Sequence, residues 1–453
     1  MKATLMLMKN KTIKKIRKNK SNMKYKLIFA FLLLFPLYSF SADLDTTVTE
    51  AFELYSVNNY AEAAPMFEEA YYMAKKNSAK DVSSRFRTSL YAGLSYRGLG
   101  EYSQAKAWFL VSLALAEKVQ DLYDKPTLIA YVAESARLAG DIKEAEEYYT
   151  KALLYEDLTD RDKAVLYYGL AETNRLAEHY SLSKDNCDKA LNYATGLKLQ
   201  KILSSCDIIY GEYYRTHKDY AKAMFYFGRA ADTSRARKYS DILVPALNGL
   251  GLTSEALHRS DAAREYFEQS FFVAVENGAI DNVDIIYQKI MKYMPEKGSF
   301  KYQGDKSLEL AGLEFLDDDT SLLLYSLSAL YYRLGQRYVE LYTAAEEGYN
   351  LAITLSNSQA AAEFVYDMAL SLYHAKEYEE CTARSEEAIW RLKSTDKRDL
   401  ISNAYYIQAE SYYNLGYYDH AYFSINKAVS YAKLADYERL NKRLNEIKAK
   451  ADK

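Results

Sequence analysis

The sequence predicts an all-α protein built as a solenoid of stacked helix hairpins. A small residue recurs about every 40 positions, and a second small residue follows each of them 19 positions later. No stretch alternates apolar and polar residues with period two over any length, so no sheet is expected. A fixed period of this size is typical of repeats that each contact only their neighbours along the chain.

The paired small residues set the register of the repeats. The first residues of the pairs are Ala51, Gly93, Ala133, Ala171, Gly211, Gly251, Ala329, Ala369 and Ala409. The second residues, in the same order, are Ala70, Ser112, Ala152, Ala190, Ala230, Ser270, Gly348, Ala388 and Ala428. One pair is missing, between Gly251 and Ala329. Two antiparallel helices approach closely only where small side chains face each other, so these residues are expected at helix crossings.

Turn residues fall inside each pair and separate two helices. They are Gly100-Glu101, Gly140-Asp141, Lys218-Asp219, Gly335-Gln336 and Gly416-Tyr417. A large residue follows the turn and is expected to open the second helix, as do Tyr60, Tyr102, Ile142, Tyr180 and Tyr220. The chain has 453 residues, of which 46 are Tyr and only 5 are Pro. Tyr can fill half-buried space between helices because its hydroxyl reaches water.

The pattern within a repeat resembles the tetratricopeptide repeat family. The fifth repeat carries its signature residues at Gly211, Tyr214, Tyr220, Ala223, Phe227 and Ala230. The resemblance covers about residues 45–430, with a period of about 40 rather than the family's usual 34. It implies a right-handed superhelical solenoid of about nine to ten antiparallel hairpins. It also implies a scaffold that binds protein or peptide in a concave groove lined by the first helices.

The repeats divide the chain into predicted segments. A signal peptide is expected at 1–41, six repeats at 42–278, a degenerate repeat acting as a joint at 279–320, and three repeats at 321–453. This last segment ends in a capping helix, which is expected from apolar residues at helical spacing: Tyr437, Leu440, Leu444 and Ile447.

Within the degenerate repeat, the sequence predicts a mobile loop at 295–305. Pro295, Gly298 and Gly304 disfavour helix there. The second helix of this repeat is expected at Ser307 to Phe315.

The N-terminus has the features of a secretory leader. Ten Lys and Arg and no acidic residue lie between Lys2 and Lys26, and an apolar run follows up to Phe40. The run is too short to span a bilayer, which takes about 20 residues. Small residues before Ala42 predict cleavage there. The alternatives are a leader retained as an anchor and a start at Met23. Export to the periplasm or exterior of a bacterium is therefore expected, with no membrane insertion after cleavage.

Removing the leader changes the charge balance. The whole chain has 59 basic and 62 acidic residues, a net charge of −3. Without residues 1–41, 49 basic residues remain and the net charge is −13. An acidic surface disfavours nucleic acid and anionic lipid as partners.

Three cysteines remain in the chain. Cys381 replaces an Ala of other repeats and is expected to be a buried small apolar residue. Cys187 and Cys206 are 19 residues apart, on helices that should pack together. They are either a disulfide or two separate buried thiols.

No motif for catalysis, a cofactor or a metal is found. His179, His217 and His258 fall at or near successive turns, too far apart to share one ion. The run Asp317 to Asp319 lacks the spaced ligands and glycine of a calcium loop and is expected to start a helix.

Charged residues repeat on the first helices of repeats two to five. An Arg recurs four positions after the small residue, and in three repeats a Glu precedes it by three positions. We refer to these residues as the ladder: Arg97, Glu134, Arg137, Glu172, Arg175, Glu212 and Arg215. In the family this face lines the groove, and an Arg fork suits carboxylates, so the ladder is a candidate site for an extended acidic peptide. The alternative is that Glu and Arg pair with each other as a solvated ion ladder.

These observations predict an exported, non-enzymatic scaffold that binds a protein or peptide. The alternative from another class is a ligand-sensing subunit that acts through a separate membrane signalling partner. An enzyme with a site built between repeats is a third possibility.

Overall fold

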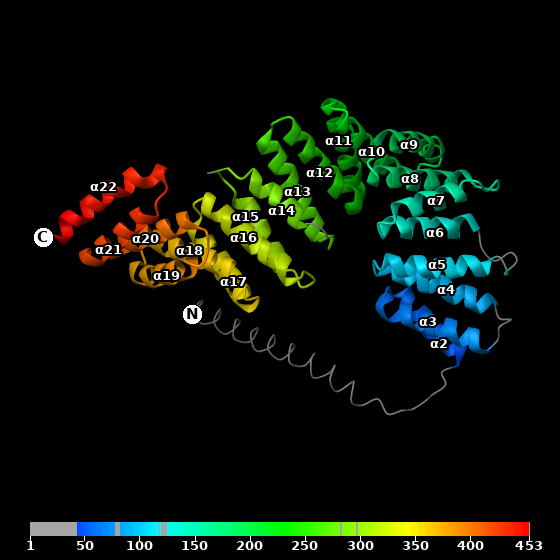
Figure 1. The fold of residues 1–453 in the computed structure, drawn as a ribbon, viewed down its shortest axis with the longest axis horizontal. Helices are drawn as coiled ribbons and strands as arrows, with labels where there is room; N and C mark the ends of the chain where they lie inside the picture. Colours follow the sequence, from blue (N-terminus) through cyan, green and yellow to red (C-terminus); the bar gives the residue numbers. More distant parts are fainter. Residues whose placement is uncertain are drawn as a thin grey trace. The chain divides into compact units, whose positions relative to one another are not determined.

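The computed structural model describes residues 43–77, 82–116, 118, 125–280, 283–295 and 298–452. The predicted signal peptide lies outside the described residues. The described part of the chain contains 21 helices and no strand (Figure 1). Within nine of the repeats, two consecutive helices pack on each other as a hairpin, and a single helix follows the last hairpin. The predicted all-α solenoid is therefore confirmed.

The chain divides into two compact units, Met1–Ala152 and Leu153–Lys453. The first unit contains three hairpins. Their helices are α2 (Leu44–Ser56), α3 (Tyr60–Asn77), α4 (Val82–Gly98), α5 (Tyr102–Ala116), α6 (Lys125–Leu138) and α7 (Ile142–Ala152).

The second unit contains six hairpins, two short helices between the third and the fourth of them, and the terminal helix. Its helices are α8 (Asp160–Leu176), α9 (Tyr180–Ala194), α10 (Gln200–Thr216), α11 (Tyr220–Arg237), α12 (Ser240–Ala256), α13 (Ser260–Glu276), α14 (Val283–Lys292), α15 (Lys301–Ala311), α16 (Asp318–Leu334), α17 (Tyr338–Thr354), α18 (Ser358–Ala375), α19 (Tyr378–Leu392), α20 (Arg398–Asn414), α21 (Tyr418–Tyr431) and α22 (Leu434–Ala451). The predicted joint at 279–320 lies inside this unit.

Each small residue of the nine pairs is buried, which confirms the repeat register. At the glycines of the first helices, however, the opposing group is an aromatic ring rather than a second small side chain. A Cβ atom added at Gly93 would lie 2.7 Å from Cδ1 of Phe109, and one added at Gly251 would lie 2.5 Å from Cε1 of Phe267. The glycine makes room for the ring of the second helix.

A left-handed residue closes the first helix of nine hairpins. It lies seven positions after the first small residue in every case, at Asn58, Gly100, Gly140, Glu178, Lys218, His258, Gln336, Lys376 and Gly416. In the turn after α10, the amide of Lys218 donates to the carbonyl of Arg215 and that of Asp219 donates to Tyr214. These bonds satisfy carbonyl groups at the helix end, as in other left-handed caps. The predicted turns are thus confirmed.

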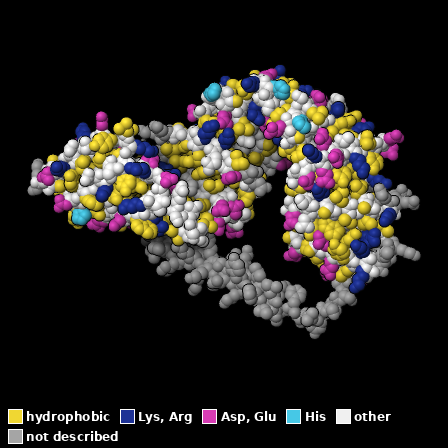
Figure 2. All heavy atoms as spheres, viewed as in Figure 1, with side chains coloured by type: hydrophobic (Ala, Val, Ile, Leu, Met, Phe, Trp, Pro, Cys, Tyr) yellow, Lys and Arg dark blue, Asp and Glu magenta, His cyan; other side chains and the backbone are white. Residues whose placement is uncertain are grey.

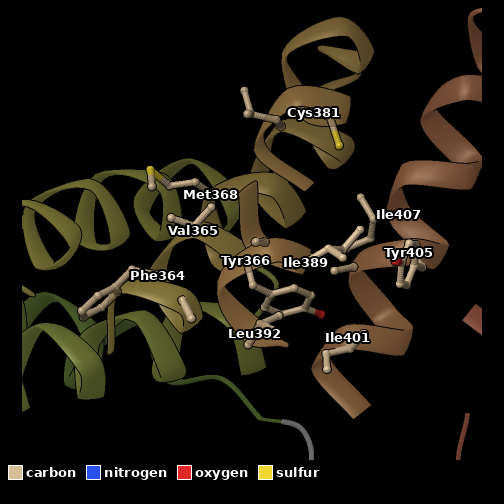
Figure 3. Close-up of a cluster of buried hydrophobic side chains, with 14 of the residues drawn as sticks. Phe364, Val365, Tyr366, Met368, Cys381, Ile389, Leu392, Ile401, Tyr405 and Ile407 are labelled. Atoms are coloured by element: carbon tan, nitrogen blue, oxygen red, sulfur yellow. The ribbon is translucent and has the colours of Figure 1, made fainter. Parts of the chain in front are cut away.

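The core consists of separate clusters between neighbouring hairpins. Figure 3 shows part of the C-terminal cluster, which extends from α16 to α22. Phe364 and Tyr366 come from α18, Ile389 from α19, and Ile401 and Tyr405 from α20. Such local clusters are expected of a solenoid, in which each repeat buries its apolar face against the next.

The degenerate repeat contains two short helices, α14 and α15, which pack mainly on α13 and α16 respectively, and its second helix differs from the expectation. Helix α15 begins at Lys301 and ends at Ala311, so part of the predicted loop is helical. Gly304 lies inside this helix, where a Cβ atom would lie 2.7 Å from Cε1 of Tyr332. The hydroxyl of Ser328 also donates to the carbonyl of Gly304 at 2.9 Å. This glycine therefore allows α15 to approach α16 closely, rather than breaking a helix.

Helix α22 covers the end of the last hairpin, as predicted. Leu440 and Ile447 are buried in the C-terminal cluster and Leu444 packs beside them, while Tyr437 is exposed. None of the described helices is long and apolar enough to cross a membrane.

In the second unit, consecutive first helices contact one another. This holds for α8 with α10, α10 with α12, α16 with α18, and α18 with α20. The second helices α9, α11, α17, α19 and α21 make no comparable contact with each other. The first helices therefore form a continuous surface within each of these groups, and this surface is where the ladder residues of the unit lie.

Candidate functional site

In the first unit, the ladder joins α4 to α6. The guanidinium of Arg97 forms an ion pair with Glu134 at 2.9 Å. Both side chains are about one-third exposed, and Cζ of Arg97 also lies 5.5 Å from the ring centre of Tyr131. Arg137 interacts with the hydroxyl of Tyr149, whose pKa burial raises to about 12. These contacts position the side chains before any partner arrives.

In the second unit, the ladder is paired within each helix. Both Nε and Nη2 of Arg175 donate to Oε2 of Glu172, at 3.1 and 2.9 Å. Arg215 binds Glu212 in the same way, at 3.1 and 2.6 Å. The i,i+3 spacing places both groups on one face of the helix and explains this geometry. Each of these carboxylates thus already accepts hydrogen bonds from the arginine of its own repeat.

Charged side chains of neighbouring repeats also interact electrostatically. Burial lowers the pKa of Arg175, but Glu172 and, from the next first helix, Glu212 outweigh it and raise the pKa above its usual value. Arg175 therefore lies between two carboxylates and stays fully charged. The side chains of Arg175 and Arg215 remain 28% and 27% exposed.

The same register continues into repeats that the sequence analysis did not follow. Four positions after Gly251 stands Glu255, an acid where the ladder has Arg. Its carboxylate binds Lys289 at 3.0 Å, Lys292 at 2.5 Å and the hydroxyl of Tyr293 at 2.5 Å. Burial opposes ionisation, but these three partners lower the pKa of Glu255 to about 2. The cluster ties α12 to α14 of the degenerate repeat.

Arg333 of α16 occupies the next ladder position, four residues after Ala329. It forms an ion pair at 2.7 Å with Asp367 of α18, which is buried. Burial raises the pKa of Asp367 to about 6 even though Arg333 opposes the shift. The residue four positions after the small residue thus forms an ion pair with the next first helix here, as Arg97 and Glu255 do in their repeats.

A final pair fixes the terminal helix. Glu410 follows the small residue Ala409 directly, as Glu134, Glu172 and Glu212 follow theirs. Arg443 of α22 donates to both carboxylate oxygens of Glu410, at 2.6 and 2.9 Å. Spacing from the small residue was the signal that could have predicted Glu255, Arg333 and Glu410.

On the face shown in Figure 2, Lys and Arg side chains are interspersed with Asp and Glu in both units. A surface of mixed sign differs from the basic stripe that nucleic-acid binding requires.

The two neighbouring cysteines are free thiols in this structure. Cys187 and Cys206 are both fully buried, and Sγ of Cys206 lies 4.0 Å from the carbonyl oxygen of Cys187. Whether Cys187 and Cys206 form the disulfide in the protein stays a prediction, which the thiol count described in the Discussion tests. Burial, with Cys206 beside it, raises the pKa of the Cys187 thiol. Cys381 is buried as predicted and accepts a hydrogen bond from Ser411 at 3.2 Å.

The remaining residues singled out in the sequence have structural places. His179 and His217 flank helix ends, and His258 is the left-handed residue of its turn. Asp317 caps α16 by accepting from the amide of Thr320 at 2.6 Å. Among the described residues, no three His, Cys, Asp or Glu side chains are placed to hold a metal ion.

Several solved structures are similar to this chain at low sequence identity. A Rap protein complexed with competence and sporulation factor is 14% identical, with a TM-score of 0.37, covering 89% of this chain and 99% of that one. Aspartyl phosphate phosphatase F from Bacillus subtilis is 14% identical, with a TM-score of 0.33, covering 89% and 97%. A tetratricopeptide repeat protein from Parabacteroides merdae is 11% identical, with a TM-score of 0.37, covering 56% and 99%. Since these scores lie below 0.5, no property of these proteins is transferred.

No curated protein matches the sequence. Residues 402–433, which span most of α20 and α21, match the family model of the tetratricopeptide repeat. The matched segment contains the small residues Ala409 and Ala428, and the same register is buried in eight further hairpins of the described chain. Residues 402–433 of this chain thus form a tetratricopeptide repeat, within a solenoid that repeats the same register.

Proposed function

We propose that this protein is a non-enzymatic scaffold that binds a protein or extended peptide along its first helices, at the ladder. The observation that supports this most is the exposure of Arg175 and Arg215. Each guanidinium is held in place by a Glu, yet more than a quarter of each side chain is open to solvent. A fork that is already ordered loses little conformational freedom when it binds a carboxylate of a partner.

The position of these groups also supports an extended ligand. Arg175 and Arg215 belong to α8 and α10, which contact each other directly. A ligand crossing these helices would meet one guanidinium per repeat. We further propose that the protein acts outside the cytoplasm, on the basis of the leader sequence at 1–41.

Site-specific photo-cross-linking tests the proposed surface. Thr216 shares a helix face with Glu212 and is exposed, so a benzoylphenylalanine at this position samples the ladder. The matched control carries the same group at Phe225 of α11, an exposed position on a second helix. The proposal predicts a discrete cross-linked partner from Thr216 and none from Phe225. Cross-linking from Phe225 alone would contradict it.

A small-molecule sensor is the second candidate function, and one observation favours it. A pocket of about 530 Å³ lies among α19, α20 and α21, within the size range of ligand sites. Native mass spectrometry of the protein purified from its own cells distinguishes the two. A bound small molecule at stoichiometric occupancy supports the sensor, and a bound protein supports the scaffold.

A further inference from the structure

The pocket between the second helices α19 and α21 has an aromatic lining, with α20 as its floor. Tyr405 and Gln408 of α20 are buried at the bottom, and Tyr405 can be followed in Figure 3. Trp390 and Phe423 form the walls and are 71% and 60% exposed. Large aromatic side chains exposed at the mouth of a pocket are typical of binding sites. None of the ladder residues takes part.

The two aromatic walls already interact with cations. Cζ of Arg391 lies 5.7 Å from the ring centre of Trp390, and Nζ of Lys427 lies 5.6 Å from that of Phe423. Each cation comes from the same helix as its ring and occupies one face. Aromatic faces attract cations because the ring carries negative charge density there.

Two carboxylates stand at the pocket and are available to a ligand. Glu386 of α19 and Asp419 of α21 are exposed, and neither forms an ion pair with any residue in the described part of the chain. Glu386 and Tyr412 both line the pocket, and burial, together with the charge of Glu386, raises the pKa of Tyr412. Lys393, the one Lys or Arg in the lining, is two helical turns beyond Glu386, about 10 Å along the axis. Lys393 is thus separated from Glu386 along α19, while His420 lines the pocket beside Asp419.

Gln408 supplies an orienting donor. It is 7% exposed, and its Oε1 accepts a hydrogen bond from Ser424 at 2.9 Å. With Oε1 directed at Ser424, the amide nitrogen donates to none of the described residues and remains a donor for a ligand. A backbone carbonyl of a bound peptide would satisfy it.

We infer that this pocket binds an arginine or lysine side chain of an extended peptide. The cationic group meets Glu386 and Asp419, the aliphatic stem packs between Trp390 and Phe423, and a peptide carbonyl accepts from Gln408. The inference rests on the proposed binding function and adds a second place of contact, on the second helices, with the opposite charge preference. The net charge of −13 for residues 42–453 favours basic segments in the same way.

Tryptophan fluorescence measures this binding directly. The chain has two Trp, and Trp108 is buried and donates to Glu68 at 2.7 Å, so Trp390 dominates any change. The probes are three blocked pentapeptides of Gly and Ala with a central arginine, citrulline or glutamate. Citrulline has nearly the shape of arginine without its charge. The arginine peptide should bind about fivefold or more tightly than the citrulline peptide, and the glutamate peptide more weakly still.

Matched variants assign the effect to the pocket. Glu386→Gln with Asp419→Asn should reduce the affinity for the arginine peptide to that for citrulline, and Phe423→Ala should weaken both. The controls are Glu379→Gln, an exposed acid of α19 outside the pocket, and Phe225→Ala, the exposed ring at the equivalent position of α11. Both should bind like the wild type. Equal affinity for arginine and citrulline, or an unchanged Glu386→Gln Asp419→Asn variant, would overturn the inference.

The outcome is separable from that of the proposed function. If the partner still cross-links from Thr216 while no arginine peptide binds, the pocket inference fails and the scaffold stands. If the arginine peptide binds with the predicted variant effects but Thr216 captures nothing, the pocket stands and the ladder proposal fails.

Discussion

Gly211 of α10 lies against the ring of Phe227 of α11, and this contact defines how a hairpin closes. A Cβ atom at Gly211 would lie 2.5 Å from Cε1 of Phe227, and the same ring faces Gly249 of α12. One fully buried phenylalanine therefore fills the space among three helices. The packing of a repeat on the next depends on the absence of side chains at two glycines.

Replacing Gly211 should therefore destabilise the protein. Gly211→Ala is expected to cost about 1–3 kcal/mol, because the added methyl group must displace a ring that has no room to move. Gly228→Ala, in α11 of the same hairpin, meets nothing within 4 Å and should stabilise by about 0.5–1 kcal/mol through helix propensity. Chemical denaturation of both variants measures the difference. Equal changes in stability for the two variants would show that α10 and α11 do not cross at Gly211.

Lys218→Gly should stabilise the α10–α11 turn. Lys218 has φ of 61°, in the left-handed region that costs a side-chain-bearing residue about 1–2 kcal/mol. Glycine is also more flexible in the unfolded chain, which offsets part of this gain in stability. The free energy of unfolding is therefore expected to rise by about 0.5–1 kcal/mol. Ala221→Gly, an exposed site in the next helix, should instead destabilise by up to about 1 kcal/mol. Thermal melts that shift in the same direction for both would contradict the role of Lys218.

The Glu255 cluster should stabilise the fold in a pH-dependent way. Its pKa is lowered from 4.5 to about 2 in the folded chain, so the stabilisation is complete above about pH 4.5 and is lost as the pH falls towards 2. Glu255→Gln should thus lower the melting temperature at pH 7, and the gap to the wild type should shrink at pH 3.5. Glu265→Gln, an exposed acid of α13, serves as the control and should show no such trend. A difference in melting temperature that does not depend on pH would mean that the ionised carboxylate of Glu255 does not stabilise the fold.

Removing the ladder charges in pairs should affect binding more than stability. Alanine at Arg175 alone would leave the poorly exposed Glu172 without its partner, which would itself destabilise. Glu172→Gln combined with Arg175→Gln avoids this, and partly exposed ion pairs typically contribute about 0–1 kcal/mol. The double variant should keep its melting temperature and weaken partner binding, whose affinity in the wild type should fall with salt. Similar variants at Arg137 and Arg215 extend the test. Unchanged capture by these variants would show that the ladder is only structural.

The cysteines should titrate as three buried free thiols. In the native protein, a thiol reagent should react slowly with all of them, because Cys187, Cys206 and Cys381 are fully buried and the pKa values of Cys187 and Cys381 are raised. After denaturation without reductant, three thiols per chain should react. A count of one thiol would instead show that Cys187 and Cys206 are bonded.

The turns show where residue identity was a weak guide. At Gly100, Gly140 and Gly416 the left-handed residue is a glycine, so these turns could be predicted from residue identity alone. Other turns place Glu178 or His258 in the same conformation, which no propensity would assign. The register from the small residue would have found them, because the turn geometry repeats even where the residue does not.

By itself, the sequence determined the nine hairpins that carry the paired small residues, their register and the terminal capping helix. Each of these depends on contacts within about 40 residues, which recur and therefore appear as a period. Only the tertiary structure decided which charged groups meet, such as Arg333 with Asp367, 34 residues apart, and that Trp390 and Phe423 line one pocket. Repeat spacing places Arg333 at a ladder position, but its partner and the neighbours of the exposed rings are set by how successive hairpins pack.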